Sequence, residues 1–130
     1  MTTPSNQWRG SGVVLLVDDE EAVRGVAARV LQRSGFEVVE AGSGEEAIAH
    51  CASTTTGPRA VVLDLTMPGL GGEATFHEIR RRWPGLPVVV SSGYMPQEGG
   101  DLQHVPFLAK PYRPSELIDL LRRVLEPQET

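Results

Sequence analysis

Residues 60–69 read Ala-Val-Val-Leu-Asp-Leu-Thr-Met-Pro-Gly. The four leading apolar residues are typical of a strand that is buried on both faces, as in a parallel sheet covered by helices. Because Pro68 and Gly69 favour a turn, Asp64 is predicted to lie at the carboxyl end of this strand. Open α/β sheets bind their ligands at this edge. A carboxylate there costs free energy unless another group uses or neutralises it.

The chain on either side alternates short apolar runs with helical patterns. Further strands are predicted at 13–17, 36–41, 88–91 and 107–109, and helices at about 20–34, 43–52, 73–83 and 115–125. This alternation predicts the α/β class, with a doubly wound, five-stranded parallel sheet and helices on both faces. Ser43 and Glu46 form a capping-box pattern. Gly25 costs about 1 kcal/mol inside a helix relative to alanine, and we interpret it as a site of close packing.

The length of 130 residues indicates one domain. We expect a flexible lead-in at 1–12, a folded domain at 13–126 and a short tail at 127–130. Residues 95–105 contain one proline and two glycines. We therefore predict a loop or a single turn there, which is a shortened fourth helix.

Composition excludes several classes of function. The net charge of −5 argues against binding to nucleic acid and, more weakly, to anionic membranes. No apolar run approaches the roughly 20 residues needed to cross a bilayer, and the N-terminus lacks the layout of a secretory signal. The single cysteine, Cys51, fits a reducing compartment, and we expect it to be buried on a helix. These features favour a cytoplasmic location without direct membrane contact.

Polar residues follow four of the predicted strands, namely Asp18-Asp19, Asp64, Ser92 and Lys110. Since the carboxyl ends of parallel strands share one edge of the sheet, these side chains should converge. Three converging carboxylates repel one another unless a pKa rises or a cation lies between them. Oxygen ligands without nearby His or Cys select a hard ion such as Mg²⁺. A lysine and a hydroxyl beside them make a pocket for a dianion such as a phosphoryl group.

In combination these motifs resemble the receiver domain of two-component response regulators, over about Val13 to Glu126. The resemblance implies a flavodoxin-like sheet with strand order 2-1-3-4-5. It implies that Asp64 is the phosphoacceptor, a carboxylate nucleophile that attacks a phosphohistidine. Asp19, Asp64 and the backbone carbonyl of Thr66 would bind Mg²⁺ directly, and Asp18 would act through a water.

The resemblance also implies roles at the fourth and fifth strands. Lys110 would pair with the phosphoryl oxygens, and Ser92 would donate a hydrogen bond to one of them. Phe107 would be the aromatic switch residue that swings inward when Ser92 moves. The Lys110–Pro111 peptide would be cis. Such a domain catalyses only its own phosphorylation and dephosphorylation, so we do not expect an enzyme with an external substrate.

The implied partner is a histidine kinase or a phosphotransfer domain. It would dock on a surface that includes Val23, Val26, Pro111 and Tyr112. The Ser-Ser-Gly-Tyr sequence at 91–94 resembles receivers at the C-terminus of hybrid histidine kinases. Because the fourth helix is predicted to be short, we expect a monomer.

Four alternatives remain. A stand-alone single-domain regulator shares every feature above, and a degenerate receiver would act only as a binding module. An aspartyl phosphatase or phosphotransferase would need a second acid where Thr66 stands. Residues 76–80 resemble the phosphoacceptor box of a kinase, but they fall on a helix of a complete α/β pattern, and the chain lacks ATP-binding glycine motifs.

Overall fold

The computed structural model describes residues 9–53, 57–67, 71–93, 102 and 105–126. Within them, five strands form a parallel sheet in the order β2-β1-β3-β4-β5. The strands are β1 (Val13–Val17), β2 (Glu37–Ala41), β3 (Ala60–Asp64), β4 (Val88–Ser92) and β5 (Phe107–Ala109). The predicted class, the flavodoxin-like architecture and the strand order are confirmed.

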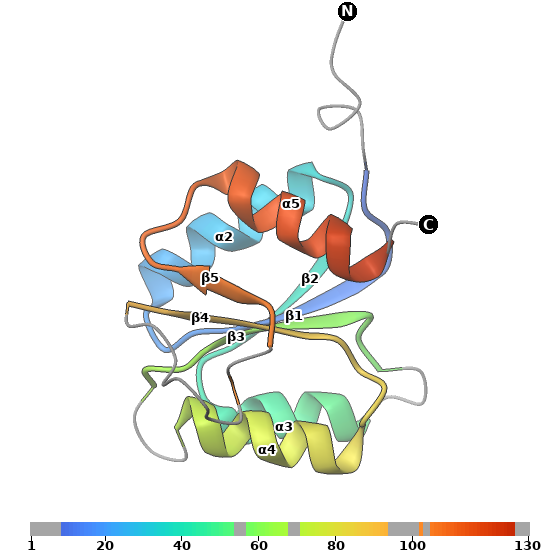
Figure 1. Cartoon of the computed structure of the whole chain (residues 1–130), viewed down its shortest axis with the longest axis vertical. Coiled ribbons are helices and arrows are strands. Elements are labelled where there is room, and N and C mark those ends of the chain that lie inside the picture. Colours follow the sequence, from blue (N-terminus) through green and yellow to red (C-terminus); the bar gives the residue numbers. More distant parts are fainter. Residues whose placement is uncertain (1–8, 54–56, 68–70, 94–101, 103–104, 127–130) are drawn as a thin grey trace, which may run out of the picture.

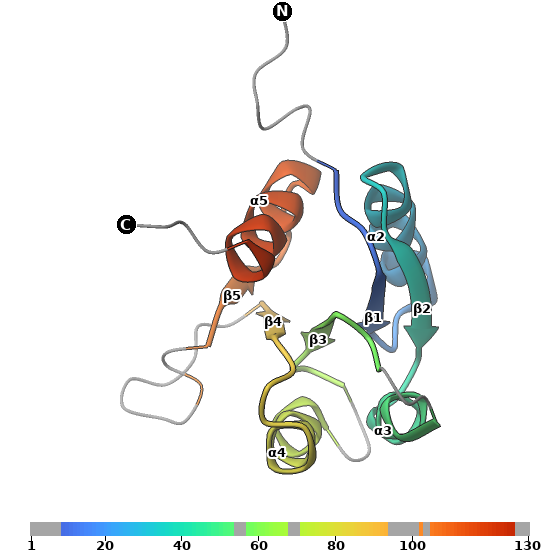
Figure 2. The same cartoon turned by 90° about the vertical axis from the view of Figure 1, so that its right-hand side faces the viewer.

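Helices cover both faces of this sheet, as Figures 1 and 2 show. One face carries α2 (Glu21–Arg33) and α5 (Pro114–Leu125), and the other carries α3 (Gly44–Ser53) and α4 (Gly72–Arg82). Because side chains alternate along a strand, neighbouring residues of β1 enter different halves of the core. Leu16 packs in the cluster under α2 and α5, and Leu15 in the cluster under α3 and α4.

The central strand β3 has a neighbour on each side, and all five of its residues are buried. Residues 60–63 therefore lie between the two apolar layers, and Asp64 is buried where those layers end. Strand β2 lies at the edge of the sheet, and its Glu37 and Glu40 are exposed. Glu37 and Glu40 are three residues apart and therefore point to opposite faces, so β2 is less completely covered than the central strand β3.

Of two local predictions about the helices, one is confirmed and one is wrong. At α3, Ser43 Oγ accepts a hydrogen bond from the Glu46 amide at 3.1 Å, as the capping-box pattern predicts. The Glu46 carboxylate accepts from the amide of Gly42 at 2.6 Å. The interpretation of Gly25 was wrong, because a methyl group at this position would have no neighbour within 4 Å.

Several predictions fall on residues outside the described ranges. The shortened fourth helix lies mostly at 94–101 and 103–104, and the lead-in and tail include 1–8 and 127–130. Residues just before β1 are described, and they contact the domain: the Gly10 amide donates to the Ser34 carbonyl at 2.6 Å. No helix in the described part of the chain has the length and apolar character needed to cross a membrane.

Candidate functional site

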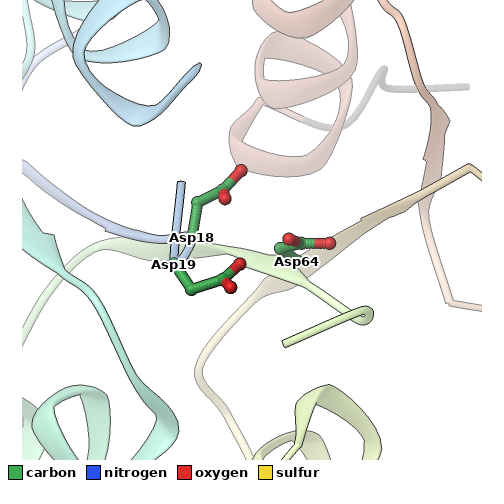
Figure 3. Close-up of side chains that lie close together, drawn as sticks. All are labelled: Asp18, Asp19 and Asp64. Atoms are coloured by element: carbon green, nitrogen blue, oxygen red, sulfur yellow. The ribbon is translucent and has the colours of Figure 1, made fainter. Parts of the chain in front are cut away.

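Three carboxylates meet at the carboxyl edge of the sheet (Figure 3). Asp18 and Asp19 directly follow β1, and Asp64 is the last residue of β3. One carboxylate oxygen from each residue lies within 4.8 Å of the other two. Asp18 and Asp64 are 4% and 1% exposed, whereas Asp19 is open to solvent. The cluster is therefore enclosed by protein on one side and accessible on the other.

The two oxygens of Asp64 have different surroundings. Oδ1 accepts hydrogen bonds from the Thr66 amide at 3.1 Å and from the Thr66 hydroxyl at 2.8 Å. Oδ2 is buried and receives no hydrogen bond of good geometry within the described structure. A buried, incompletely satisfied carboxylate oxygen is costly unless another group binds it.

Lys110 supplies the positive charge beside this oxygen. Its Nζ lies 3.2 Å from Asp64 Oδ2 and 3.1 Å from Asp18 Oδ2. Burial alone would lower the pKa of Lys110, but the hydrogen bond to Asp18 and the charges of Asp64 and Asp18 outweigh it and raise the pKa. The ammonium is therefore retained at neutral pH, and it contacts two of the three carboxylates.

This arrangement fits a hard divalent cation. The cluster offers only oxygen atoms, including the buried Oδ2 of Asp64, and one positive charge leaves it short of neutrality. Each oxygen of Asp18 accepts one hydrogen bond, Oδ2 from Lys110 and Oδ1 from the Glu20 amide at 2.9 Å. Asp64 Oδ2, in contrast, has no hydrogen-bond partner among the described residues.

The other predicted site residues lie on β4 and β5. Ser92 ends β4 and is 4% exposed, and its carbonyl accepts a hydrogen bond from the Lys110 amide at 2.9 Å. Phe107 begins β5 opposite Val90 and packs partly buried against the core under α3 and α4. It does not belong to the carboxylate cluster. The Lys110–Pro111 peptide is cis.

A groove of 640 Å³ leads away from the cluster between α2 and the segment that follows β5. Its lining includes Lys110 and all four residues of the predicted partner surface: Val23, Val26, Pro111 and Tyr112. Val23 and Val26 are 38% and 60% exposed, the large apolar side chains most open to solvent in the described structure. Apolar side chains exposed next to a charged site are typical of an interaction surface.

Sequence reasoning missed two residues that shape the site. Arg24 donates from Nη1 to the carbonyl of Asp18 at 2.7 Å and from Nε to Glu40 at 2.9 Å. Gly72 begins α4 so close to the end of β3 that a methyl group there would overlap the backbone of Leu65 and approach the carbonyl of Asp64 at 2.6 Å. No sequence pattern predicts the contacts of Arg24, because its long side chain can reach many different partners.

Comparison with known proteins identifies the family. The model of the response regulator receiver domain matches residues 14–122. The sensor kinase CckA of Brucella abortus is 35% identical over 126 residues. These residues are 92% of this chain but 13% of CckA, so the chain spans only a small part of the length of that relative.

Two solved structures show the same fold. The receiver domain of the hybrid histidine kinase CckA is 37% identical, with a TM-score of 0.73, and the match covers 88% of this chain and 100% of that one. The response regulator TrrA of Thermotoga maritima, solved in complex with Mg²⁺-BeF, is 27% identical, with a TM-score of 0.78 and coverage of 87% and 98%. The chain therefore belongs to the response regulator receiver domain family of two-component systems.

Proposed function

We propose that this domain accepts a phosphoryl group on Asp64 from a phosphohistidine. The observation that carries the proposal is Asp64 Oδ2, a buried carboxylate oxygen without a good hydrogen bond and 3.2 Å from Lys110 Nζ. This oxygen attacks phosphorus, the phosphorus–nitrogen bond breaks, and the imidazole leaves with the electron pair of that bond. The product is an acyl phosphate on Asp64. Phosphoryl transfer of this kind needs mainly positioning and neutralisation of charge.

Mg²⁺ would be held by Asp19, Asp64 and the backbone carbonyl of Thr66, and Asp18 would act through a water. When bound, it neutralises charge on the carboxylates and on the phosphoryl oxygens. The likeness to TrrA, which was solved with Mg²⁺-BeF, supports this assignment. The hydrogen bonds that occupy both oxygens of Asp18 support its indirect role.

Lys110 and Ser92 would bind the oxygens of the phosphoryl group on Asp64. Lys110 already bridges Asp18 and Asp64, so its ammonium can follow the negative charge as it moves from the carboxylate to the phosphoryl oxygens. Ser92 ends the neighbouring strand and is tied to Lys110 through the backbone. Movement of Ser92 would be passed to Phe107 on β5, which is the proposed switch.

We propose that the groove between α2 and the segment after β5 receives a helix of the histidine kinase or phosphotransfer domain. Its apolar wall and its opening beside Lys110 support this role. Val26→Asp should slow transfer from a phosphorylated partner, because it puts a charge into this wall, while labelling by a small phosphodonor is unchanged. Val124→Asp on α5 is not a suitable control, since Val124 packs against the core. Ala74→Asp on the exposed surface of α4 is suitable.

The likeness to a hybrid kinase receiver favours a role within a longer sensor kinase. A stand-alone regulator is the second candidate, because TrrA, also similar over most of this chain, is a response regulator. In both cases we propose that the domain turns over no external substrate and works in the cytoplasm as a monomer. A degenerate receiver is disfavoured, because the structure brings Asp18, Asp19, Asp64 and Lys110 together.

The test is phosphorylation of the purified domain by acetyl phosphate in the presence of Mg²⁺. We expect an acid-stable, base-labile phosphate on the parent protein and none on Asp64→Asn. Asp119→Asn, which alters an exposed aspartate of α5, is the matched control and should be labelled normally. Equal labelling of Asp64→Asn and the parent would disprove the assignment, and failure of the parent to be labelled with Mg²⁺ would favour the binding module.

A further inference from the structure

Arg24 lies in the first turn of α2 and joins three segments of the chain. Its Nη1 donates to the carbonyl of Asp18, and its Nε donates to the carboxylate of Glu40 on β2. Its side chain is only 16% exposed, whereas that of Glu40 is 40% exposed. The guanidinium therefore acts as a partly buried clamp between the loop after β1 and the end of β2.

Asp18 is fixed from several directions. Its carbonyl accepts from Arg24 at 2.7 Å, and its amide donates to the carbonyl of Ala41 at 3.1 Å. Its side chain accepts from the Glu20 amide and from Lys110. Of these partners, Arg24 is the only one that holds the Asp18 carbonyl within the described structure, and this carbonyl belongs to the peptide unit that leads into Asp19.

Asp19 has no comparable support of its own. Its side chain is exposed and makes no hydrogen bond to the described residues, yet its carboxylate lies in the cluster with Asp18 and Asp64. The place of this carboxylate therefore depends on how the backbone on either side is held. On the C-terminal side, the Glu20 amide is bonded to Asp18, and the Glu20 carbonyl accepts from the Arg24 amide at 2.9 Å.

We propose that Arg24 is a positioning residue for the metal site: by holding the Asp18 carbonyl, it sets the Asp19 carboxylate where a divalent cation needs it. The inference rests on the Mg²⁺ site of the proposed function and adds a residue to it. Groups that orient metal ligands from outside the coordination sphere commonly change metal affinity by about 10–100-fold when they are removed.

Simple electrostatics makes the opposite prediction. Arg24 is a positive charge near a cation site, so its removal should strengthen Mg²⁺ binding if charge alone matters. If Arg24 instead positions Asp19, its removal should weaken binding despite the loss of this repulsion. The sign of the change therefore separates the two explanations.

The experiment measures Mg²⁺ affinity by isothermal titration calorimetry for the parent, Arg24→Met and Arg24→Lys. We expect Arg24→Met to weaken binding roughly tenfold. Arg24→Lys keeps the charge but lacks the planar fork that serves two partners in fixed directions, so it should also weaken binding. Arg81→Met is the matched control, because Arg81 also binds a glutamate, Glu78, but on the exposed surface of α4. The Mg²⁺ affinity of Arg81→Met should equal that of the parent.

A second readout is the rate of labelling by acetyl phosphate at increasing Mg²⁺ concentration. We expect Arg24→Met to need more Mg²⁺ for half-maximal rate and to reach the rate of the parent at saturation. Unchanged or tighter Mg²⁺ binding by both Arg24 variants would overturn the inference, whatever their thermal stability. If the parent itself bound no Mg²⁺, the proposed function would fail instead.

Discussion

The charge balance at the carboxylate cluster makes a prediction about stability without any metal. Three carboxylates face the single ammonium of Lys110. Removing one carboxylate should relieve repulsion, and removing the ammonium should leave two buried carboxylates without their counter-charge. We therefore expect Asp19→Asn and Lys110→Met to change the free energy of unfolding in opposite directions when a chelator removes divalent cations.

The two magnitudes follow from distance and burial. One carboxylate oxygen of Asp19 lies within 4.8 Å of an oxygen of each of the other two carboxylates, so the three charges repel one another. Because Asp19 is exposed, water screens this repulsion. Its neutralisation should stabilise the fold by up to about 1 kcal/mol. Lys110 Nζ is 3.2 Å from the buried Oδ2 of Asp64. Removing one partner of a buried ion pair costs roughly 3 kcal/mol or more, because the remaining charge stays desolvated.

Without metal, the expected order of stability is Asp19→Asn, then the parent, then Lys110→Met. Millimolar Mg²⁺ should reduce the differences in free energy of unfolding between the parent and both variants. A ligand at tenfold its dissociation constant stabilises the native state by about 1.4 kcal/mol. The parent should gain this amount, Asp19→Asn should gain less because it lacks one of the proposed Mg²⁺ ligands, and Lys110→Met should gain more because the competing ammonium is gone. Urea unfolding with and without Mg²⁺, followed by circular dichroism and by the fluorescence of the partly buried Trp83, measures all three.

The control for this series is Asp119→Asn, which removes an exposed charge far along α5 and should change stability by less than about 0.5 kcal/mol. The reasoning fails if Asp19→Asn is less stable than the parent in chelator, or if Lys110→Met is as stable as the parent there. The first result would mean that the carboxylates do not repel one another across the cluster, and the second that the Lys110 ammonium does not stabilise the buried carboxylates.

Four further predictions concern other parts of the chain. Gly25→Ala should raise the free energy of unfolding by about 1 kcal/mol, because its methyl group meets nothing; Gly72→Ala should lower it by about 1–3 kcal/mol, because its methyl group overlaps backbone. Both are measured by urea unfolding. The variant Tyr94→Phe leaves Tyr112 as the only tyrosine. Burial raises the pKa of Tyr112 above 10.0, so the absorbance change that accompanies ionisation of its phenol should have its midpoint above that pH. The stability that the neutral phenol contributes is present below pH 10.0 and is lost as pH rises through the higher folded value. Light scattering should show a monomer with and without beryllium fluoride; a dimer induced by beryllium fluoride would contradict the short segment expected at 95–105.

Most of the fold could be predicted from the short apolar runs and the helical patterns between them. A short apolar run such as 60–63, closely followed by turn residues, is typical of a strand buried on both faces, so the order of elements could be predicted from the sequence. Gly25 shows what pattern alone cannot decide. A glycine in a helix signals either close contact or nothing, and only the position of neighbouring helices separates the two. Here no atom comes near it.

The site was predictable to the extent that it depends on the backbone. Asp64 lies at the carboxyl edge of the sheet because it is the last residue of β3, and this position does not depend on the contacts of its side chain. The contacts made by side chains were not predictable in the same way. The resemblance to receiver domains implies a role for the carbonyl of Thr66, whereas the structure shows its amide and hydroxyl donating to Asp64 Oδ1. Arg24 reaches the Asp18 carbonyl through a flexible chain of single bonds that no sequence pattern constrains.

The distribution of charge along the chain also has a consequence for switching. Asp18 and the Lys110 that neutralises it are 92 residues apart, and Lys110 follows β5, a strand of only three residues at the edge of the sheet. β5 pairs with β4 alone, and the Lys110 amide is bonded to the carbonyl of Ser92. A displacement of β5 along β4 therefore moves the ammonium relative to Asp64. A change in charge at Asp64 should shift β5 for the same reason, since the coupling between two sites acts equally in both directions.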